Sequence, residues 1–188
     1  NNSYNHKSSN IKSALSTNDK SLHICFLVLY LGFLSAILGE FAFCKCLYML
    51  SSKSNKDQSQ TEFTIDRIQY FLEEYPNTGH KDECESMIVK LRTKLAKKEI
   101  DAGKLYLRID KYDSALIYFN LVMIEYYDTI YFDEALINIL LTHALKGDLK
   151  IAEIFFNDNK NKFQSNDKLN KAIQILKDSK EGSKLSKY

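Results

Sequence analysis

The sequence predicts an all-α protein, a solenoid of stacked helical hairpins in which one long helix joins two hairpins. Three observations favour this fold. Residues 97–127, KKEIDAGKLYLRIDKYDSALIYFNLVMIEYY, read as two helices around a short turn. Core positions of this hairpin recur at a constant spacing further along the chain. Finally, the 188 residues include 1 Pro and 6 Gly, fewer turn residues than a loop-rich all-β protein needs.

The hairpin at residues 97–127 has the layout of a tetratricopeptide-type repeat. Small side chains stand where the two helices must approach closely, and aromatic side chains fill the space beside them. The small residues are Ala102, Gly103 and Ala115, and the aromatic ones are Tyr106, Tyr112 and Phe119. A hairpin of this kind cannot bury its apolar face alone, so we expect neighbours of the same type on each side.

A second copy of this pattern follows in the sequence. The three positions Tyr112, Ala115 and Phe119 correspond to Leu149, Ala152 and Phe156, each displaced by 37 residues (149 − 112). A constant displacement at three core positions is what a structural repeat predicts. Ala115 and Ala152 are then the points of closest helix packing. The alternative is an irregular helical bundle in which these are ordinary core residues.

Composition and motifs argue against chemistry and against nucleic acid as a partner. The 26 basic and 24 acidic residues leave a formal net charge of +2, too small to favour nucleic-acid binding. Phosphate loops, nucleophile elbows and helical metal motifs are absent from the sequence, so we expect no enzyme activity, no catalytic residue, no cofactor, no metal site and no small-molecule substrate. We expect the four cysteines to be buried structural thiols, and these are Cys25, Cys44, Cys46 and Cys84.

The N-terminal part divides into two segments before the repeats. Residues 1–20 are rich in Asn, Ser and Lys, and we expect them to be flexible. Residues 21–38 hold an apolar run, Leu22 to Leu38, at the short edge of what spans a bilayer. It is open whether this run is a membrane anchor with Lys12 and Lys20 on the cytoplasmic side, a buried helix of the stack, or the apolar region of a signal peptide.

Residues 39–177 form the expected repeat domain, followed by a flexible tail at 178–188. A first helix at 39–50 should bury one side, with Phe41, Cys44, Tyr48 and Met49, before a loop at 51–60. Thr61 is a candidate cap for the next helix, which Pro76 ends. The apolar stripe of that helix is Phe63, Ile65, Ile68, Phe71 and Leu72.

The remaining helices are read from the apolar period and the breaks between segments. A helical pattern runs from Lys81 to Arg108, twice the length of a normal repeat helix, and can join two hairpins rigidly. Its apolar positions are Met87, Ile88, Leu91, Leu95, Ile100, Leu105 and Leu107. After a turn at 109–111 we expect helices at 112–126, 131–146 and 149–157, and a terminal one around Phe163, Leu169, Ile173 and Leu176.

The motifs of residues 39–157 resemble those of the BamD (ComL/YfiO) family, periplasmic lipoproteins of the outer-membrane β-barrel assembly machinery. Hairpins of this family end in a YP-(N/D)-(S/T) turn, and the helix that follows begins with acidic residues. Here these are YPNT at 75–78 with KDE at 81–83, and YYDT at 126–129 with DEA at 133–135. The segment LRTKLAKKEIDAGKLY is the most similar part. Tyr127 stands where the turn proline is usual.

The resemblance implies a non-enzymatic, membrane-associated lipoprotein at the periplasmic face of the outer membrane of a Gram-negative bacterium. Its expected partners are the barrel-insertion protein of the machinery and unfolded outer-membrane proteins. The alternative is a membrane-anchored tetratricopeptide scaffold for another complex. Because first helices of stacked hairpins line a concave groove, we expect partner-binding side chains on that face, namely Lys97, Lys104, Arg108 and Glu134.

Overall fold

The computed structural model describes the backbone of residues 2–53 and 58–182, and the side chains of residues 26–51 and 58–182. Within these ranges every regular element is a helix, so the predicted fold class is confirmed. The elements are α1 (Asn2–Lys53), α2 (Gln58–Glu74), α3 (Lys81–Arg108), α4 (Tyr112–Glu125), α5 (Phe132–Lys146), α6 (Leu149–Asn159), the 3-10 turn η1 (Lys160–Lys162) and α7 (Asn166–Lys180).

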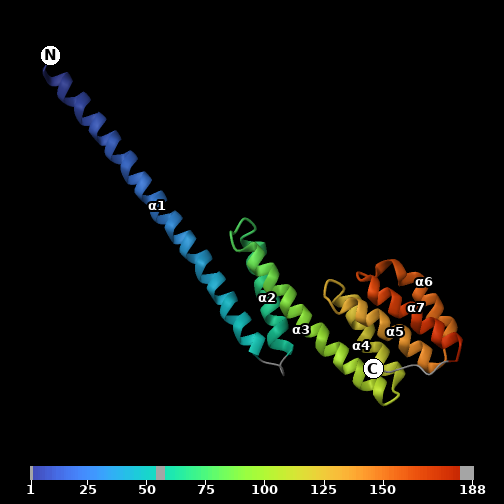
Figure 1. The fold of residues 1–188 in the computed structure, drawn as a ribbon. Helices are drawn as coiled ribbons and strands as arrows, with labels where there is room; N and C mark the ends of the chain where they lie inside the picture. Colours follow the sequence, from blue (N-terminus) through green and yellow to red (C-terminus); the bar gives the residue numbers. More distant parts are fainter. Residues whose placement is uncertain (1, 54–57, 183–188) are drawn as a thin grey trace.

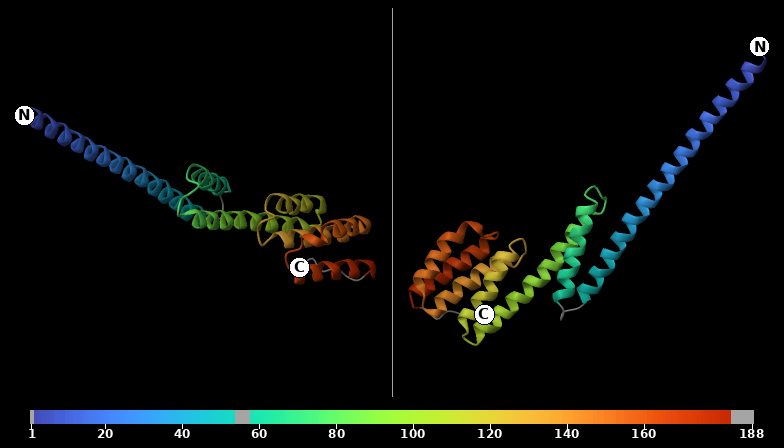
Figure 2. Two further views of the ribbon diagram at one scale, coloured as in Figure 1. Left: turned by 90° about the horizontal axis from the view of Figure 1, so that it is seen from above. Right: turned by 180° about the vertical axis from the view of Figure 1, so that it is seen from behind.

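Helices that follow one another in sequence pack side by side as antiparallel pairs (Figure 1). α2 lies between the end of α1 and the first half of α3, while α4, α5, α6 and α7 gather at the second half of α3. Figure 2 shows α1 projecting far beyond the other helices in both further views. The molecule is therefore an elongated stack in which the two halves of α3 pack in two different groups of helices.

The long helix has the bounds that the sequence predicts. α3 runs over Lys81–Arg108, and α2 ends at Glu74, two residues before Pro76. The predicted turn at 109–111 is made by Asp110, whose φ of 58° is in the left-handed region that an aspartate tolerates. The amide of Lys111 donates a hydrogen bond to the carbonyl of Tyr106 at 3.0 Å, which closes the end of α3.

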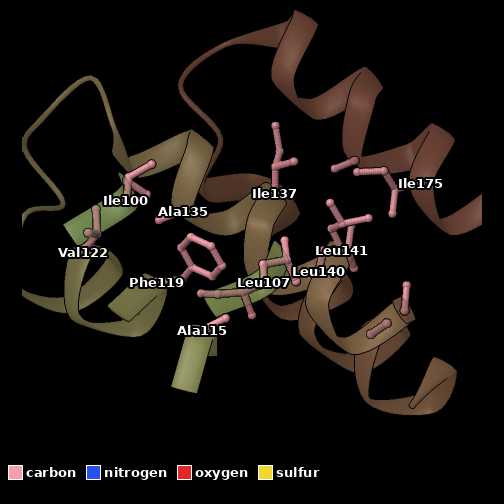
Figure 3. Packing of buried hydrophobic residues seen from close by; sticks show 14 of the residues in the cluster. Ile100, Leu107, Ala115, Phe119, Val122, Ala135, Ile137, Leu140, Leu141 and Ile175 are labelled. Carbon is pink, nitrogen blue, oxygen red and sulfur yellow. The ribbon is translucent and has the colours of Figure 1, made fainter. Parts of the chain in front are cut away.

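The larger core joins α3, α4, α5, α6 and α7. Phe119 of α4 is wholly buried at its centre, with Leu107 and Ala135 beside the ring (Figure 3). Gly103 of α3 faces the same ring: a Cβ atom at this position would lie 2.4 Å from Cε1 of Phe119. The prediction that Gly103 permits a close helix approach is thus confirmed.

The repeat relation also appears in the packing. Ala115 of α4 and Ala152 of α6 are both 0% exposed, as expected for points of closest approach. Their equivalents one turn later differ, because Phe119 is wholly buried whereas Phe156 is half-buried at the edge of the same core. The displacement of 37 residues therefore relates two hairpins of which the second is nearer the surface.

The smaller core joins α1, α2 and the first half of α3. Its buried members are Phe41, Cys44, Ile65, Ile68, Phe71, Cys84, Met87, Leu91 and Leu95. Tyr126, at the end of α4, packs against both cores. The two cores consequently meet at the middle of α3.

Several predicted core positions are wrong, because the apolar period fixes a stripe only to within a helix turn. Met49 and Phe63 are each 52% exposed, and Leu105 is 56% exposed. On α1 the buried stripe passes through Leu47 instead of Met49. Cys46 is exposed, since it lies two residues from Cys44 and so on another side of the helix.

The predicted loop at 51–60 is shorter in the structure. α1 continues to Lys53 and α2 begins at Gln58, so Thr61 is a buried residue inside α2 and no cap. The buried hydroxyls of Ser51 and Thr64 lie 2.7 Å apart, and Ser51 Oγ also donates to the carbonyl of Gln60. These bonds tie the two helices together across the connection.

The N-terminal segment is helical where the sequence predicts a flexible chain. The backbone of residues 2–20 belongs to α1, and no Gly or Pro interrupts the sequence before Gly32, so nothing stops the helix from extending outward from the apolar run. At the other end, α7 takes in the first residues of the predicted tail, 178–180, and residues 183–188 lie outside the described part.

The apolar run of α1 is exposed in the structure. The side chains of Phe26–Leu31 are 54–69% exposed. The ring of Phe33 contacts that of Tyr75, just after α2, with 6.1 Å between the ring centroids. By length and composition, Phe26–Ser51 qualifies as a candidate membrane span. Burial inside the described part of the chain is thus wrong for residues 26–31, and the anchor interpretation stays a prediction.

Candidate protein-binding surface

The four predicted partner-binding residues do not form one cluster. Lys104 and Glu134 meet, since Nζ of Lys104 lies 2.5 Å from Oε1 of Glu134 and links α3 to α5. Lys97 pairs within α3, with its Nζ 2.6 Å from Oδ2 of Asp101. Arg108 is exposed at the end of α3. Two of the four thus orient helices in the fold, and two are exposed cations.

An apolar stripe covers the outer face of α4. Ile117, Leu121 and Ile124 follow one another at spacings of four and three residues, so they share one face, and they are 69%, 39% and 62% exposed. The opposite face of α4 is fully buried through Ala115, Phe119 and Val122. A helix that is apolar on both sides is normally covered on both sides. We call these three exposed residues the α4 stripe.

The α4 stripe leads into an open hollow of about 450 Å³ beyond the end of the helix. Two exposed apolar side chains of the α4–α5 connection extend the surface, namely Tyr127 (62%) and Ile130 (77%). The residues that line the hollow are Met123, Ile124, Tyr127, Phe132, Lys162 and Gln164. Stripe and hollow together form a continuous apolar surface of the kind that marks protein-binding sites.

The walls of the hollow are held by hydrogen bonds between distant segments. The Asp133 carboxylate accepts bonds from the backbone amides of Gln164 (2.9 Å to Oδ1) and Ser165 (2.8 Å to Oδ2). The side-chain amide of Gln164 donates to the carbonyl of Tyr127 at 3.3 Å. The α4–α5 connection is therefore fixed to the segment that enters α7, which favours a preformed surface.

A second, smaller groove of about 210 Å³ lies where α2, α3 and the end of α4 meet. It is lined by Glu62, Ile65, Asp66, Gln69, Arg92, Leu95, Glu125 and Tyr126. Three of these side chains are carboxylates and one is a cation. Neither this groove nor the hollow beside α4 is lined by any of the four predicted partner-binding residues.

Arg92 holds the junction between the two cores. Its guanidinium donates to both carboxylate oxygens of Asp128, at 2.8 and 2.7 Å, and to the carbonyl of Glu125 at 2.5 Å. Its charge also lies 5.5 Å from the ring centroid of Tyr126. The hydrogen bond from Arg92 lowers the pKa of Asp128. Burial raises the pKa of Tyr126.

We expect Arg92→Gln to lower the free energy of unfolding at pH 7 by about 1 kcal/mol, a modest loss because water screens partly exposed ion pairs. Because its pKa is lowered in the folded state, ionised Asp128 stabilises the fold at pH values above its ordinary pKa of 3.8. This contribution is lost as the pH falls through the lower pKa of the folded state. Urea unfolding at pH 7 and pH 3 should show a smaller pH effect in the variant. An equal pH effect in both proteins would contradict the role of the pair.

The sequence contained a signal for the α4 stripe that the search for charged groove residues missed. The segment 116–127, LIYFNLVMIEYY, has apolar or aromatic residues at nearly every position, so no rotation of the helix hides them all. Metal chemistry has no support in the described residues, among which no group of three or more His, Cys, Asp or Glu side chains is placed to hold an ion. The surface is suited to binding a protein.

Comparison with known proteins shows which proteins the chain is similar to. The family model YfiO, described as Outer membrane lipoprotein, matches residues 6–154, which reach from α1 into α6. The chain is also similar to Outer membrane protein assembly factor BamD of Rickettsia prowazekii (strain Madrid E), with 30% identity over 100 residues. These residues are 53% of this chain and 40% of the relative, so the match spans less than half of the relative's length.

Proposed function

Because the chain belongs to the YfiO family of outer membrane lipoproteins, we propose that it is a non-enzymatic, protein-binding component of the machinery that assembles β-barrel proteins in the outer membrane. Its place is the periplasmic face of the outer membrane of a Gram-negative bacterium. The family membership carries the proposal, and the name of the similar rickettsial protein, an assembly factor, supports it.

The proposed partner is the periplasmic part of the barrel-insertion protein, and the proposed contact is the α4 stripe with the adjoining hollow. An apolar surface on a rigid helix suits a folded partner, because both sides are preformed and little conformational entropy is lost on binding. Lys97 and Arg108, both exposed on α3, are proposed as additional charged contacts of the partner, while Lys104 and Glu134 position α3 against α5. Unfolded outer-membrane proteins are the proposed cargo of the complex.

The test is a binding measurement with matched double variants. Ile117→Gln with Ile124→Gln removes the two most exposed side chains of the α4 stripe, and Ile151→Gln with Ile154→Gln makes the same change on α6, where the side chains are 48% and 62% exposed. Calorimetric titration with the purified periplasmic domains should show at least a roughly tenfold weaker Kd for the α4 variant. The α6 variant should bind like the unchanged chain.

Equal affinity of the two double variants would overturn the assigned surface. Circular dichroism of both variants checks that the helices remain intact, since exposed positions tolerate glutamine well. If the unchanged chain does not bind the periplasmic domains at all, the assigned partner itself is wrong.

The second candidate function is a membrane-anchored scaffold for another complex, favoured by the exposed apolar run on α1. The contact between Phe33 and Tyr75 limits how much of α1 could cross a membrane. While Phe33 contacts Tyr75, the part of the apolar run before this contact, residues 22–32, is a helix about 16 Å long, half the roughly 30 Å of a bilayer core. A full crossing would require this contact to open. A reporter fused after residue 188 separates the two functions, because the assembly component requires it outside the cytoplasm.

A further inference from the structure

Two buried cysteines, Cys44 and Cys84, lie in the smaller core. Cys44 of α1 and Cys84 of α3 are both 0% exposed and belong to the same group of nine buried residues. Forty residues separate them in sequence (84 − 44). α1 and α3 contact each other directly and run in the same direction, since α2 reverses the chain between them.

Two contacts between α1 and the start of α3 fix the level at which the helices meet. The ring of Phe41 stacks on that of His80 with 3.8 Å between centroids. One turn further, Nζ of Lys45 lies 2.7 Å from Oε1 of Glu83. Cys44 precedes Lys45 and Cys84 follows Glu83, so the two buried cysteines lie at about the same level of α1 and α3. Both thiols are free, and the Cys44 thiol donates to the carbonyl of Arg67 on α2 at 3.8 Å.

The surroundings keep these thiols unreactive once the domain is folded. Their neighbours in the core are apolar side chains such as Ile68, Met87 and Leu91. Burial, with a smaller contribution from the nearby Cys44, raises the pKa of Cys84 to about 11. Because the thiolate is the reactive form, thiol exchange at this site must occur before the core closes.

We propose that Cys44 and Cys84 are a site of oxidative crosslinking, in which one disulfide joins α1 to α3 as the chain folds in the periplasm. The proposal rests on the family's periplasmic location, an oxidising compartment, and on no partner. The oxidant is a protein disulfide. One cysteine thiolate attacks it to give a mixed disulfide and a thiolate leaving group, and the second then displaces the remaining sulfur.

The balance of this exchange is complete. The two cysteines lose two protons and two electrons and gain one S–S bond, while the oxidant's disulfide is reduced to a dithiol. The product closes a loop over residues 44–84, which includes all of α2. The bond would hold the base of α1 on the stacked domain. Cys46 is exposed and lies on a different side of α1, so it offers oxidants an accessible thiol but does not face Cys84.

The test compares the full chain made in the periplasm with the same chain kept in a reducing cytoplasm. We use a Cys25→Ser chain, because tryptic cleavage then gives three peptides with one cysteine each: 21–45, 46–53 and 82–90. Free thiols are blocked with a maleimide in denaturant before digestion. In the exported chain most molecules should yield peptides 21–45 and 82–90 joined and lighter by two hydrogen atoms, with peptide 46–53 labelled. The cytoplasmic chain should yield all three labelled.

A second readout is the thermal midpoint with and without a reductant. The Tm of the exported chain should fall on reduction, whereas that of an exported Cys84→Ala variant should not change. Two results would overturn the proposal: labelled Cys44 and Cys84 in exported chains, or a disulfide that joins either one to Cys46. Neither measurement involves the barrel-insertion protein. A failure of the disulfide proposal can therefore be distinguished from a failure of the proposed function.

Discussion

Replacing Gly103 by alanine is expected to lower the free energy of unfolding by about 3 kcal/mol, at the upper end of overpacking effects. The added Cβ would lie 2.4 Å from Cε1 and 2.7 Å from Cδ1 of Phe119, whereas carbon atoms pack best at about 3.5–4.0 Å. The ring cannot move away easily, because it is 0% exposed in the centre of the larger core. α3 and α4 must therefore separate.

Thermal unfolding monitored by circular dichroism measures this effect. A loss of 3 kcal/mol corresponds to a fall in Tm of roughly 6–12 °C for a chain of this length. The matched control is Gly39→Ala, also inside a helix, where a Cβ would meet nothing within 4 Å. There we expect an unchanged or slightly higher Tm, since alanine has the better helix propensity.

A smaller ring should relieve the clash and so test its cause. Phe119→Leu alone destabilises the core by removing buried carbon atoms. Combined with Gly103→Ala, it should cost less than the sum of the two single changes, because the added Cβ finds space. Strict additivity would show that the close approach of Gly103 to the ring is not what limits the packing.

Replacing Asp133 by alanine should have a comparable effect where α5 meets the segment that enters α7, also about 3 kcal/mol. The carboxylate is 5% exposed and accepts backbone amide bonds from Gln164 and Ser165, directly before α7 begins. Without it, two amides near the core lose a charged acceptor, and the segment that enters α7 loses its hydrogen bonds to α5. Asp133→Asn should cost less, because one acceptor oxygen remains.

The control for Asp133 is another aspartate in the first turn of a helix. Asp113 of α4 pairs with Lys146 at 2.7 Å, but its side chain is 84% exposed. Asp113→Ala should change the free energy of unfolding by less than about 0.5 kcal/mol. Urea unfolding compares the variants, and limited proteolysis should cut the Asp133→Ala chain near residues 160–165 first. Similar losses in both alanine variants would contradict the role of the buried acceptor.

Helix bounds from Pro76 onward were predictable because their signals are local, whereas the predicted flexible segment at 1–20 and the cap at Thr61 were wrong. Pro76 ends α2, a stretch without breakers gives α3, and the turn at Asp110 separates α3 from α4. Which face each helix buries was less predictable, since the rotation of a helix depends on its neighbours. Leu105 illustrates this: it fits the apolar period of α3 yet is 56% exposed.

The candidate site was harder to predict than the fold. Lys104 and Glu134 were correctly assigned to neighbouring helices, but their ion pair binds them to each other, which the sequence does not reveal. The α4 stripe had a local signal in the uniformly apolar sequence of 116–127. The burial of Cys44 and Cys84 in one core had no such signal, because it depends on how α2 returns the chain over 40 residues (84 − 44).

The sharing of α3 between two cores has a consequence for how the molecule opens. In stacked repeats each unit is stabilised mainly by its neighbours, so parts can unfold separately when the coupling between them is weak. Here the coupling passes through the middle of α3, where Tyr126 packs against both cores and Arg92 holds the α4–α5 connection. Amide hydrogens of α3 should therefore exchange in two groups, with the slowest around Ile100 and Leu107. Loss of the Arg92 contacts should widen the difference between the groups.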